Sequence, residues 1–176
     1  MSEIVKAAWA EVKANSDFIS VKTFSGYNSC RADPQGVDCL MSPDISDQEL
    51  GASVLEALAQ SRFVLPEPRK DVWIHPEATF DKGLYDYGLT NQRYEAWVGS
   101  LIERYGYKSK RALFKDMKRC SVESKNGEII IRPSRHEKLE AWSGKGISES
   151  DYVVVSLNSS SAEVGAALRL AFDRCA

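Results

Sequence analysis

The segment SVESKNGEIIIR, residues 121–132, predicts a β-hairpin. Its centre is Asn126-Gly127, and Asn-Gly is a strong hairpin signal because both central residues of the favoured turn need positive φ. Outward from this hairpin, the apolar run YVVVSL at residues 152–157 predicts a buried strand. Ser160 and Glu163 then fit a capping box, so a helix is predicted to begin there.

The N-terminal third repeats this order of elements. Residues 9–24, WAEVKANSDFISVKTF, predict two alternating strands joined by a turn at residues 15–17. The apolar run at residues 37–41 predicts another strand, and Ser46 with Glu49 fits a second capping box. The side chains on one face of the helix that follows are Leu50, Val54, Leu58 and Ser61.

The two capping boxes align residue by residue, and Gly51 then falls opposite Gly165. The sequence therefore predicts an α+β fold with a mainly antiparallel sheet, built as one domain over residues 1–176. Two similar strand-strand-strand-helix units, residues 9–62 and 118–175, flank a helical insertion at residues 63–117. An ancient duplication explains this order; chance recurrence of capping boxes is the alternative.

The insertion has its own pattern. It opens with a proline-rich stretch in which residues 71–75 predict a short edge strand. A helix capped by Thr90 or Asn91 is predicted to run to about residue 105, and a short helix capped by Ser109 to about residue 117. No Gly-rich or Ser-rich linker separates the insertion from its neighbours, which favours a single domain.

Composition narrows the class of protein. A net charge of −2 argues against a chain that coats nucleic acid, and 43% hydrophobic residues suffice for a core. Residues 1–17 have no apolar run of signal-peptide length, and no window has the roughly 20 apolar residues of a membrane span. We therefore expect a cytoplasmic protein that does not enter a membrane.

Candidate chemical groups are few. The four cysteines lack Cys-x-x-Cys spacing, and we expect reduced, buried structural thiols at Cys30, Cys39, Cys120 and Cys175. His75 and His136 are the only histidines, and neither belongs to a recognised catalytic or zinc motif. Nucleophile elbows, Walker loops and dinucleotide fingerprints are also absent from the sequence. We expect no catalytic activity, no metal and no cofactor; a small enzyme built around His136 is a minor alternative.

Charges and aromatic residues gather locally. Residues 33–60 hold six acids and no lysine or arginine, whereas the segment from Lys108 to Arg119 is basic. A third cluster mixes tyrosines with acids in a loop after Phe80, and tyrosine is favoured at binding hot spots. The candidate partner-binding residues are Asp33, Asp38, Asp44, Asp47, Asp81, Tyr85, Asp86 and Tyr87. The alternative for each charged segment is a solvated face.

Four stretches are long and unusual in composition: residues 61–76 (SRFVLPEPRKDVWIHP), 80–87 (FDKGLYDY), 134–146 (SRHEKLEAWSGKG) and 164–172 (VGAALRLAF). Through them nearly the whole chain resembles the immunity proteins of contact-dependent growth inhibition (CDI) systems. The resemblance does not assign toxin contacts to the residues of these stretches, and several of them, including Pro66, Pro68, Trp73 and Trp142, are predicted to determine the fold.

The resemblance implies a cytoplasmic, non-enzymatic protein that binds the C-terminal toxin domain of a large exoprotein and covers its active site. It also implies that the toxin is a nuclease, with a ribonuclease, of ribonuclease A-like fold among others, as the expected kind. The alternative function is a nucleic-acid-binding module that uses Lys108 to Arg119.

Overall fold

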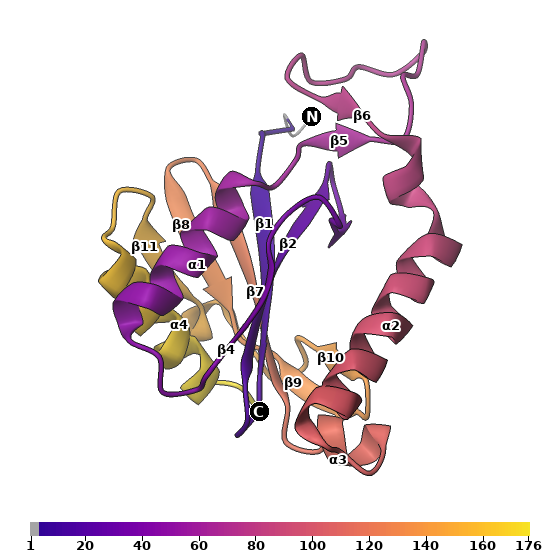
Figure 1. Ribbon diagram of the computed structural model, residues 1–176. Helices are drawn as coiled ribbons and strands as arrows, with labels where there is room; N and C mark the ends of the chain where they lie inside the picture. Colours follow the sequence, from indigo (N-terminus) through magenta and orange to yellow (C-terminus); the bar gives the residue numbers. More distant parts are fainter. Residues whose placement is uncertain (1–3) are drawn as a thin grey trace.

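The computed structural model describes residues 4–176 and contains one central antiparallel sheet in the order β11-β8-β7-β1-β2-β3, with β4 also paired to β2. Two helices cover one face of this sheet and a long third helix crosses the other (Figure 1). The strands of the sheet are β1 (Ala8–Ala14), β2 (Ile19–Gly26), β3 (Cys30–Ala32), β4 (Asp38–Met41), β7 (Lys118–Lys125), β8 (Glu128–Arg132) and β11 (Val153–Ser156).

The helices and minor strands complete the chain. They are α1 (Asp47–Ala59), β5 (Val64–Leu65), β6 (Thr79–Phe80), η1 (Lys82–Tyr85), α2 (Tyr87–Tyr105), α3 (Lys110–Phe114), β9 (Arg135–Lys138), β10 (Ala141–Ser143), η2 (Glu149–Asp151) and α4 (Ser161–Asp173). No helix in residues 4–176 is both long and apolar enough to span a bilayer. The predicted α+β class and the mainly antiparallel sheet are confirmed. Each predicted unit ends in a helix after its strands, but the first has four strands, β1 to β4, before α1, and the second has five, β7 to β11, before α4.

Both predicted hairpins are present. β1 pairs with β2 through the turn after Ala14, and β7 pairs with β8 through Asn126 and Gly127, whose φ values of 53° and 75° are those the turn requires. The strand predicted at residues 152–157 is present as β11, but its predicted burial was wrong, because β11 is the last strand of the sheet and Val154 is 50% exposed. An apolar run alone does not separate a buried strand from an edge strand.

Serine hydroxyls start the two helices of the core layer. The Ser46 Oγ accepts a hydrogen bond from the Glu49 amide (3.1 Å), and the Ser160 Oγ accepts one from the Glu163 amide (3.2 Å). Only Ser160 has the reciprocal bond, from its own amide to the Glu163 carboxylate. The predicted start points of α1 and α4 are thus confirmed, with a complete capping box at α4.

The helices α1 and α4 touch backbone to backbone at two glycines. A Cβ atom on Gly51 would lie 1.7 Å from the carbonyl oxygen of Ser161, and one on Gly165 would lie 1.9 Å from that of Asp47. These two contacts are equivalent under the alignment that matches Gly51 to Gly165. The symmetry supports the proposal of an ancient duplication, which stays a prediction.

The sheet separates two apolar clusters. The larger cluster lies between the strands and the α1–α4 layer, and its largest fully buried side chains are Leu50, Ile129, Ile131, Leu168, Val12, Val21 and Val54. The second lies on the opposite face, under α2 and α3, and contains Phe18, Trp97, Val98, Leu101, Leu113, Phe114 and Met117. The second cluster covers only one end of its sheet face.

The insertion departs from its predicted elements in three places. Residues 71–75 form a loop instead of a strand, and the His75 amide donates to the Tyr27 hydroxyl (3.0 Å), while β5 pairs in parallel with β6. Helix α2 begins before Thr90, because the Asp86 carboxylate already caps it by accepting from the Leu89 amide. Helix α3 is capped by Ser109 as predicted but ends at Phe114.

Candidate functional site

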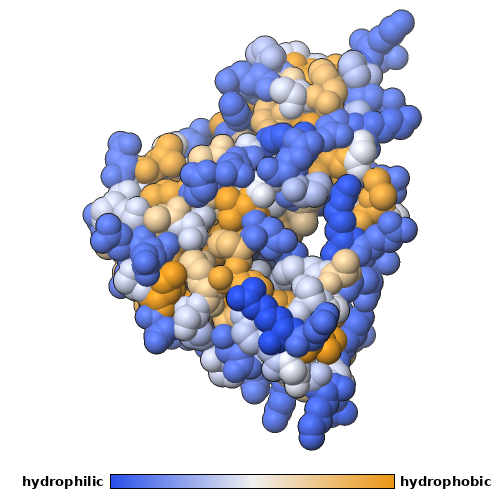
Figure 2. All heavy atoms as spheres, in the orientation of Figure 1, coloured by the Kyte–Doolittle hydropathy of each residue, from blue (hydrophilic) through white to orange (hydrophobic). Residues whose placement is uncertain are grey.

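A groove of about 740 Å³ opens between the sheet and α2. Strands β1 to β4 and the loop after β3 form its floor and one wall, and the first half of α2 forms the other wall. Figure 2 shows the molecule hollowed at this place, between the body of the sheet and the long helix of Figure 1. Two other hollows in the described part of the chain have volumes of about 440 and 280 Å³, so this larger groove is the first candidate for a binding site.

The groove exists because the strands alternate. Val12 and Val21 point into the α1–α4 core, so their neighbours Glu11, Lys13 and Lys22 point to the opposite face. Apolar side chains cover that face at its two ends, where α2 and α3 pack near Phe18 and where Trp9 packs with Tyr27 and Phe63. The uncovered part retains a charged floor under the N-terminal half of α2.

Two floor lysines lie against aromatic rings. The Lys13 Nζ is 5.0–5.4 Å from the ring centroids of Tyr94, Trp97 and Trp142, and it pairs with the Glu11 carboxylate at 3.3 Å. The Lys22 Nζ is 3.9 Å from the Trp97 centroid. Such contacts stabilise a cation that has lost much of its hydration. Burial lowers the pKa of Lys22 to about 8, although Asp38 partly offsets this shift.

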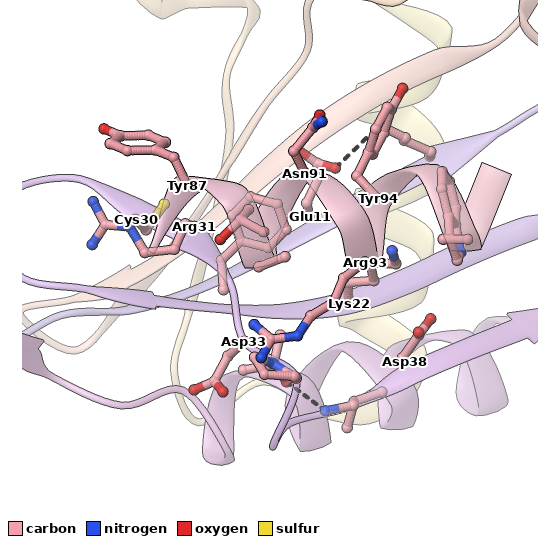
Figure 3. A pocket seen from close by; sticks show the side chains of 18 residues that line it. Glu11, Lys22, Cys30, Arg31, Asp33, Asp38, Tyr87, Asn91, Arg93 and Tyr94 are labelled. Carbon is pink, nitrogen blue, oxygen red and sulfur yellow. Dashed lines mark hydrogen bonds and ion pairs between the residues drawn. The ribbon is translucent and has the colours of Figure 1, made fainter. Parts of the chain in front are cut away.

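Three groove cations lack an ion-pair partner. Within residues 4–176, the side chains of Lys22, Arg31 and Arg93 have no carboxylate oxygen within 4.0 Å. The Arg31 guanidinium lies over the Tyr85 ring at 3.8 Å, and its Nη1 is buried without an acceptor in the described part of the chain. Figure 3 shows these three side chains around the groove, with Tyr87 near Arg31 at one end. The groove can therefore accept negative charge from a partner.

An ion network closes one end of the groove. Arg62 binds both oxygens of Asp33 (2.7 and 3.0 Å) and also pairs with Asp81 (2.9 Å). Burial by itself raises the pKa of the Asp33 carboxyl, but hydrogen bonds from Arg62, Ser25 and the Gln35 amide outweigh it and leave the pKa lowered. This network ties the loop after β3 to the segment that leads into α2.

The comparisons with known proteins agree over the whole chain. The family model described as "CdiI: CDI immunity protein" matches residues 8–175. The chain belongs to the CDI immunity protein family. It is 58% identical to the immunity protein CdiI-YPIII of Yersinia pseudotuberculosis serotype O:3 (strain YPIII), over 99% of both chains.

Two solved structures share the CDI immunity fold of this chain. A chain of the CdiA-CT/CdiI toxin and immunity complex from Yersinia pseudotuberculosis is 57% identical, with a TM-score of 0.96 over 99% of this chain and 100% of that one. A protein of unknown function from Neisseria meningitidis is 37% identical, with a TM-score of 0.81 over 100% of this chain and 99% of that one. The predicted resemblance to this family is confirmed.

The acidic residues that were predicted to contact a partner lie at separate places in the fold. Asp38 lines the groove, whereas Asp44 and Asp47 lie at the start of α1, where Asp47 pairs with Arg169 (2.8 Å). Asp33 also borders the groove, but its side chain is 0% exposed within the Arg62 network, which argues against direct contact with a partner. The acidic segment of this CDI immunity chain therefore does not form one face.

The residues of the predicted tyrosine cluster also have different roles in the fold. Tyr87 lines the groove and is 86% exposed at the first position of α2. Asp86 caps α2 and Asp81 caps η1, while the Tyr85 hydroxyl donates to the Val64 carbonyl. Tyr87 is thus the best placed of these residues for contact with a partner.

The remaining predictions concern the basic segment, the histidines and the cysteines, and the structure agrees with only some of them. Lys110 pairs with Glu95 and Glu140, so the charge of the basic segment is partly neutralised within the fold. His136 stacks on Trp142 at 4.7 Å, as expected of a structural histidine. Cys120 is buried, but the prediction of a buried thiol was wrong for Cys30, which lies exposed on the short strand β3.

Sequence reasoning missed Lys22, Arg31 and Arg93 as groove residues. The alternation of β2 does place Lys22 opposite the core face, and this signal was available. However, a strand pattern does not say whether the polar face meets water or a second layer. The predicted fold role of Trp142 is supported by its bond to the Met117 carbonyl (3.1 Å), while Trp73 lies exposed on the insertion.

Proposed function

We propose that this chain is the immunity protein of a CDI system, which binds the C-terminal toxin domain of a CdiA-type exoprotein and neutralises it. The observation that carries the proposal is the 57% identity and 0.96 TM-score to a chain of a CdiA-CT/CdiI toxin and immunity complex. The protein acts by binding and not by catalysis, in the cytoplasm of the cell that it protects. Because binding surfaces depend on side chains as well as on the fold, the cognate toxin is the partner to test.

The groove is where the toxin docks. Its volume is enough for several side chains of an inserted segment, and its rim offers the exposed ring of Tyr87. Its walls present Lys22, Arg31 and Arg93, which have no partner carboxylate in the described part of the chain. A toxin segment that enters the groove therefore carries acidic side chains that pair with them.

The toxin is a nuclease in this proposal, and the immunity protein covers its active site. A ribonuclease remains the expected kind. Its activity is tested by giving the purified toxin domain both RNA and duplex DNA, with and without the immunity protein in equal amount. We expect one of the two substrates to be cleaved and the cleavage to stop in the complex. A stable complex in which the toxin keeps full activity would reject active-site covering.

Charge reversal tests the docking site. Arg93 is exposed on α2 and lines the groove, so Arg93→Glu should leave the fold intact and weaken toxin binding about 10-fold to 100-fold. Lys145→Glu is the matched control, because Lys145 is exposed elsewhere and the same change in net charge occurs. Titration calorimetry at two salt concentrations gives both affinities. Equal losses in the two variants would reject the groove as the docking site.

A further inference from the structure

Two thiols meet on the face of the sheet opposite the groove. The Sγ atoms of Cys120 and Cys175 are 3.8 Å apart, although 55 positions separate the two residues in sequence. Cys120 is fully buried on β7 within the α1–α4 core, and Cys175 follows α4 and is half-buried. A disulfide needs a sulfur–sulfur distance of about 2.0 Å, so side-chain rotation and a small shift of the chain end would close the gap.

Backbone hydrogen bonds hold the second thiol in place. The Ala176 amide donates to the Ser134 carbonyl (3.0 Å), and the His136 amide donates to the Ala176 carbonyl (2.9 Å). The Cys175 amide also donates to the Phe172 carbonyl (3.1 Å) at the end of α4. The chain end is therefore fixed against the segment before β9, and the two thiols meet because of backbone geometry.

The two thiols differ in reactivity. A hydrogen bond from Cys120 lowers the pKa of the Cys175 thiol to about 7, whereas the same bond, together with burial, raises the pKa of the Cys120 thiol. Peroxides react with the thiolate form of a cysteine that they can reach. Cys175 meets both conditions and has a second thiol in contact with it.

We propose that Cys120 and Cys175 form an oxidisable pair that hydrogen peroxide converts into an intramolecular disulfide. The Cys175 sulfur attacks one peroxide oxygen, the O–O bond breaks, and Cys175 becomes a sulfenic acid while the other oxygen leaves as water. The Cys120 sulfur then attacks the Cys175 sulfur, the S–OH bond breaks, and the hydroxyl leaves with the Cys120 proton as a second water. The two thiols lose two electrons in total, and these reduce one peroxide to two waters.

The disulfide would link the chain end to the strand beside the centre of the sheet. It closes a long loop, which removes conformational freedom from the unfolded chain and stabilises the fold. We expect the melting temperature to rise by about 5–10 °C on oxidation. Because the pair lies on the α1–α4 side and away from the groove, the proposal does not depend on toxin binding.

The test uses a variant that keeps only this pair, Cys30→Ser with Cys39→Ser. The folded protein is treated with a small excess of hydrogen peroxide, unfolded, alkylated and weighed by intact-mass spectrometry. We expect the loss of two hydrogens, no alkylation at either cysteine, and full reversal by dithiothreitol. The melting temperature is measured before and after treatment.

Two single-thiol variants in the same background are the controls. Cys175→Ser should show no mass loss and little oxidation, because Cys120 is buried. Cys120→Ala should be oxidised at Cys175 without forming an intramolecular link; if it does not fold, Cys175→Ser alone remains a sufficient control. Two free thiols in the treated pair variant, or oxidation of Cys175 beyond the sulfenic acid without a link, would overturn the proposal. An unchanged or lower melting temperature on disulfide formation would overturn its stabilising effect.

Discussion

The two faces of the sheet are built from the same strands yet are opposite in character. On one face, Val12, Val21, Cys120 and Val122 meet two helices and form a continuous apolar core. On the other face, Glu11, Lys13 and Lys22 meet a single helix that leaves a groove. The face covered by α1 and α4 forms the continuous core of the fold, and the face crossed by α2 retains charged side chains that line the groove.

The contrast separates stability from binding. Apolar side chains between two layers contribute to folding in proportion to the area that they bury. Charged side chains held in a groove lose hydration and recover only part of that free energy from cation–π contacts. We therefore expect substitutions on the α1–α4 face to change mainly the free energy of unfolding, and substitutions on the groove face to change mainly the affinity for a partner.

The largest effect is expected where α1 and α4 touch. Gly51→Ala places a Cβ atom 1.7 Å from the Ser161 carbonyl oxygen, so the helices must separate, and we expect a loss of about 3–5 kcal/mol in the free energy of unfolding. Gly99→Ala on α2 is the control, since apart from neighbouring residues of its own helix no atom lies within 4 Å of the position that its methyl group would take, and alanine is the better helix former. Urea titration measures both; equal stability of the two variants would contradict the close helix contact.

The next effect concerns the apolar cluster beneath α2. Leu101→Ala removes a fully buried side chain there, and we expect a loss of about 2–4 kcal/mol. Because this cluster positions α2, the variant should also bind the toxin more weakly. Leu168→Ala in the α1–α4 core is the matched control, with a similar loss of stability and near-normal toxin affinity at a temperature where both are folded. The same affinity in both variants would mean that α2 does not position the docking site.

A smaller, pH-dependent effect is expected at the end of the groove. Arg62→Met leaves the Asp33 carboxylate buried without its guanidinium partner, at a cost of about 2 kcal/mol near pH 7. The lowered pKa of Asp33 means that this stabilisation is present above its unfolded value of 3.8 and is lost as pH falls through the folded pKa. The difference between wild type and variant should therefore shrink below about pH 4.

Stability curves at several pH values test this prediction. Arg169→Met is the comparison, because the Arg169 and Asp47 side chains are 37% and 45% exposed and screened by water, and the other bonds of Arg169 go to the Pro43 and Ile45 carbonyls, which do not titrate. The pH-dependent part of its loss should therefore stay below about 1 kcal/mol. A pH-independent deficit in Arg62→Met would show that packing, and not the ion pair, is what the substitution removes.

Local signals in the sequence were sufficient for most of the core unit. The turn at Asn126-Gly127, the caps Ser46 and Ser160 and the strand alternation act over a few residues, and each element formed where they indicated. Whether the run at residues 152–157 is central or at an edge depends on the sheet order, which local pattern does not encode. The same holds for β3, which forms only because β2 has a free side to pair with.

The candidate site depends on contacts that are distant in sequence. The groove brings Lys22 on β2 together with Arg93 on α2, and no local motif relates these two residues. The sequence placed Asp33 in an acidic segment, but in the fold its buried carboxylate pairs with Arg62, which lies 29 positions away in the chain. Charge counted along the chain therefore did not indicate which charged residues line the groove.

The smallest expected effect separates the two halves of the acidic segment. Asp38 lines the groove near Lys22, so Asp38→Lys adds positive charge at the proposed docking site, and the association rate of an acidic toxin segment should rise severalfold at low salt. Asp44→Lys makes the same charge change in the loop before α1, outside the groove, and should change the rate less than about 2-fold. Stopped-flow association at two salt concentrations measures both. A larger effect at Asp44 than at Asp38 would reject the groove as the docking surface. It would indicate that the toxin binds on the α1–α4 face instead.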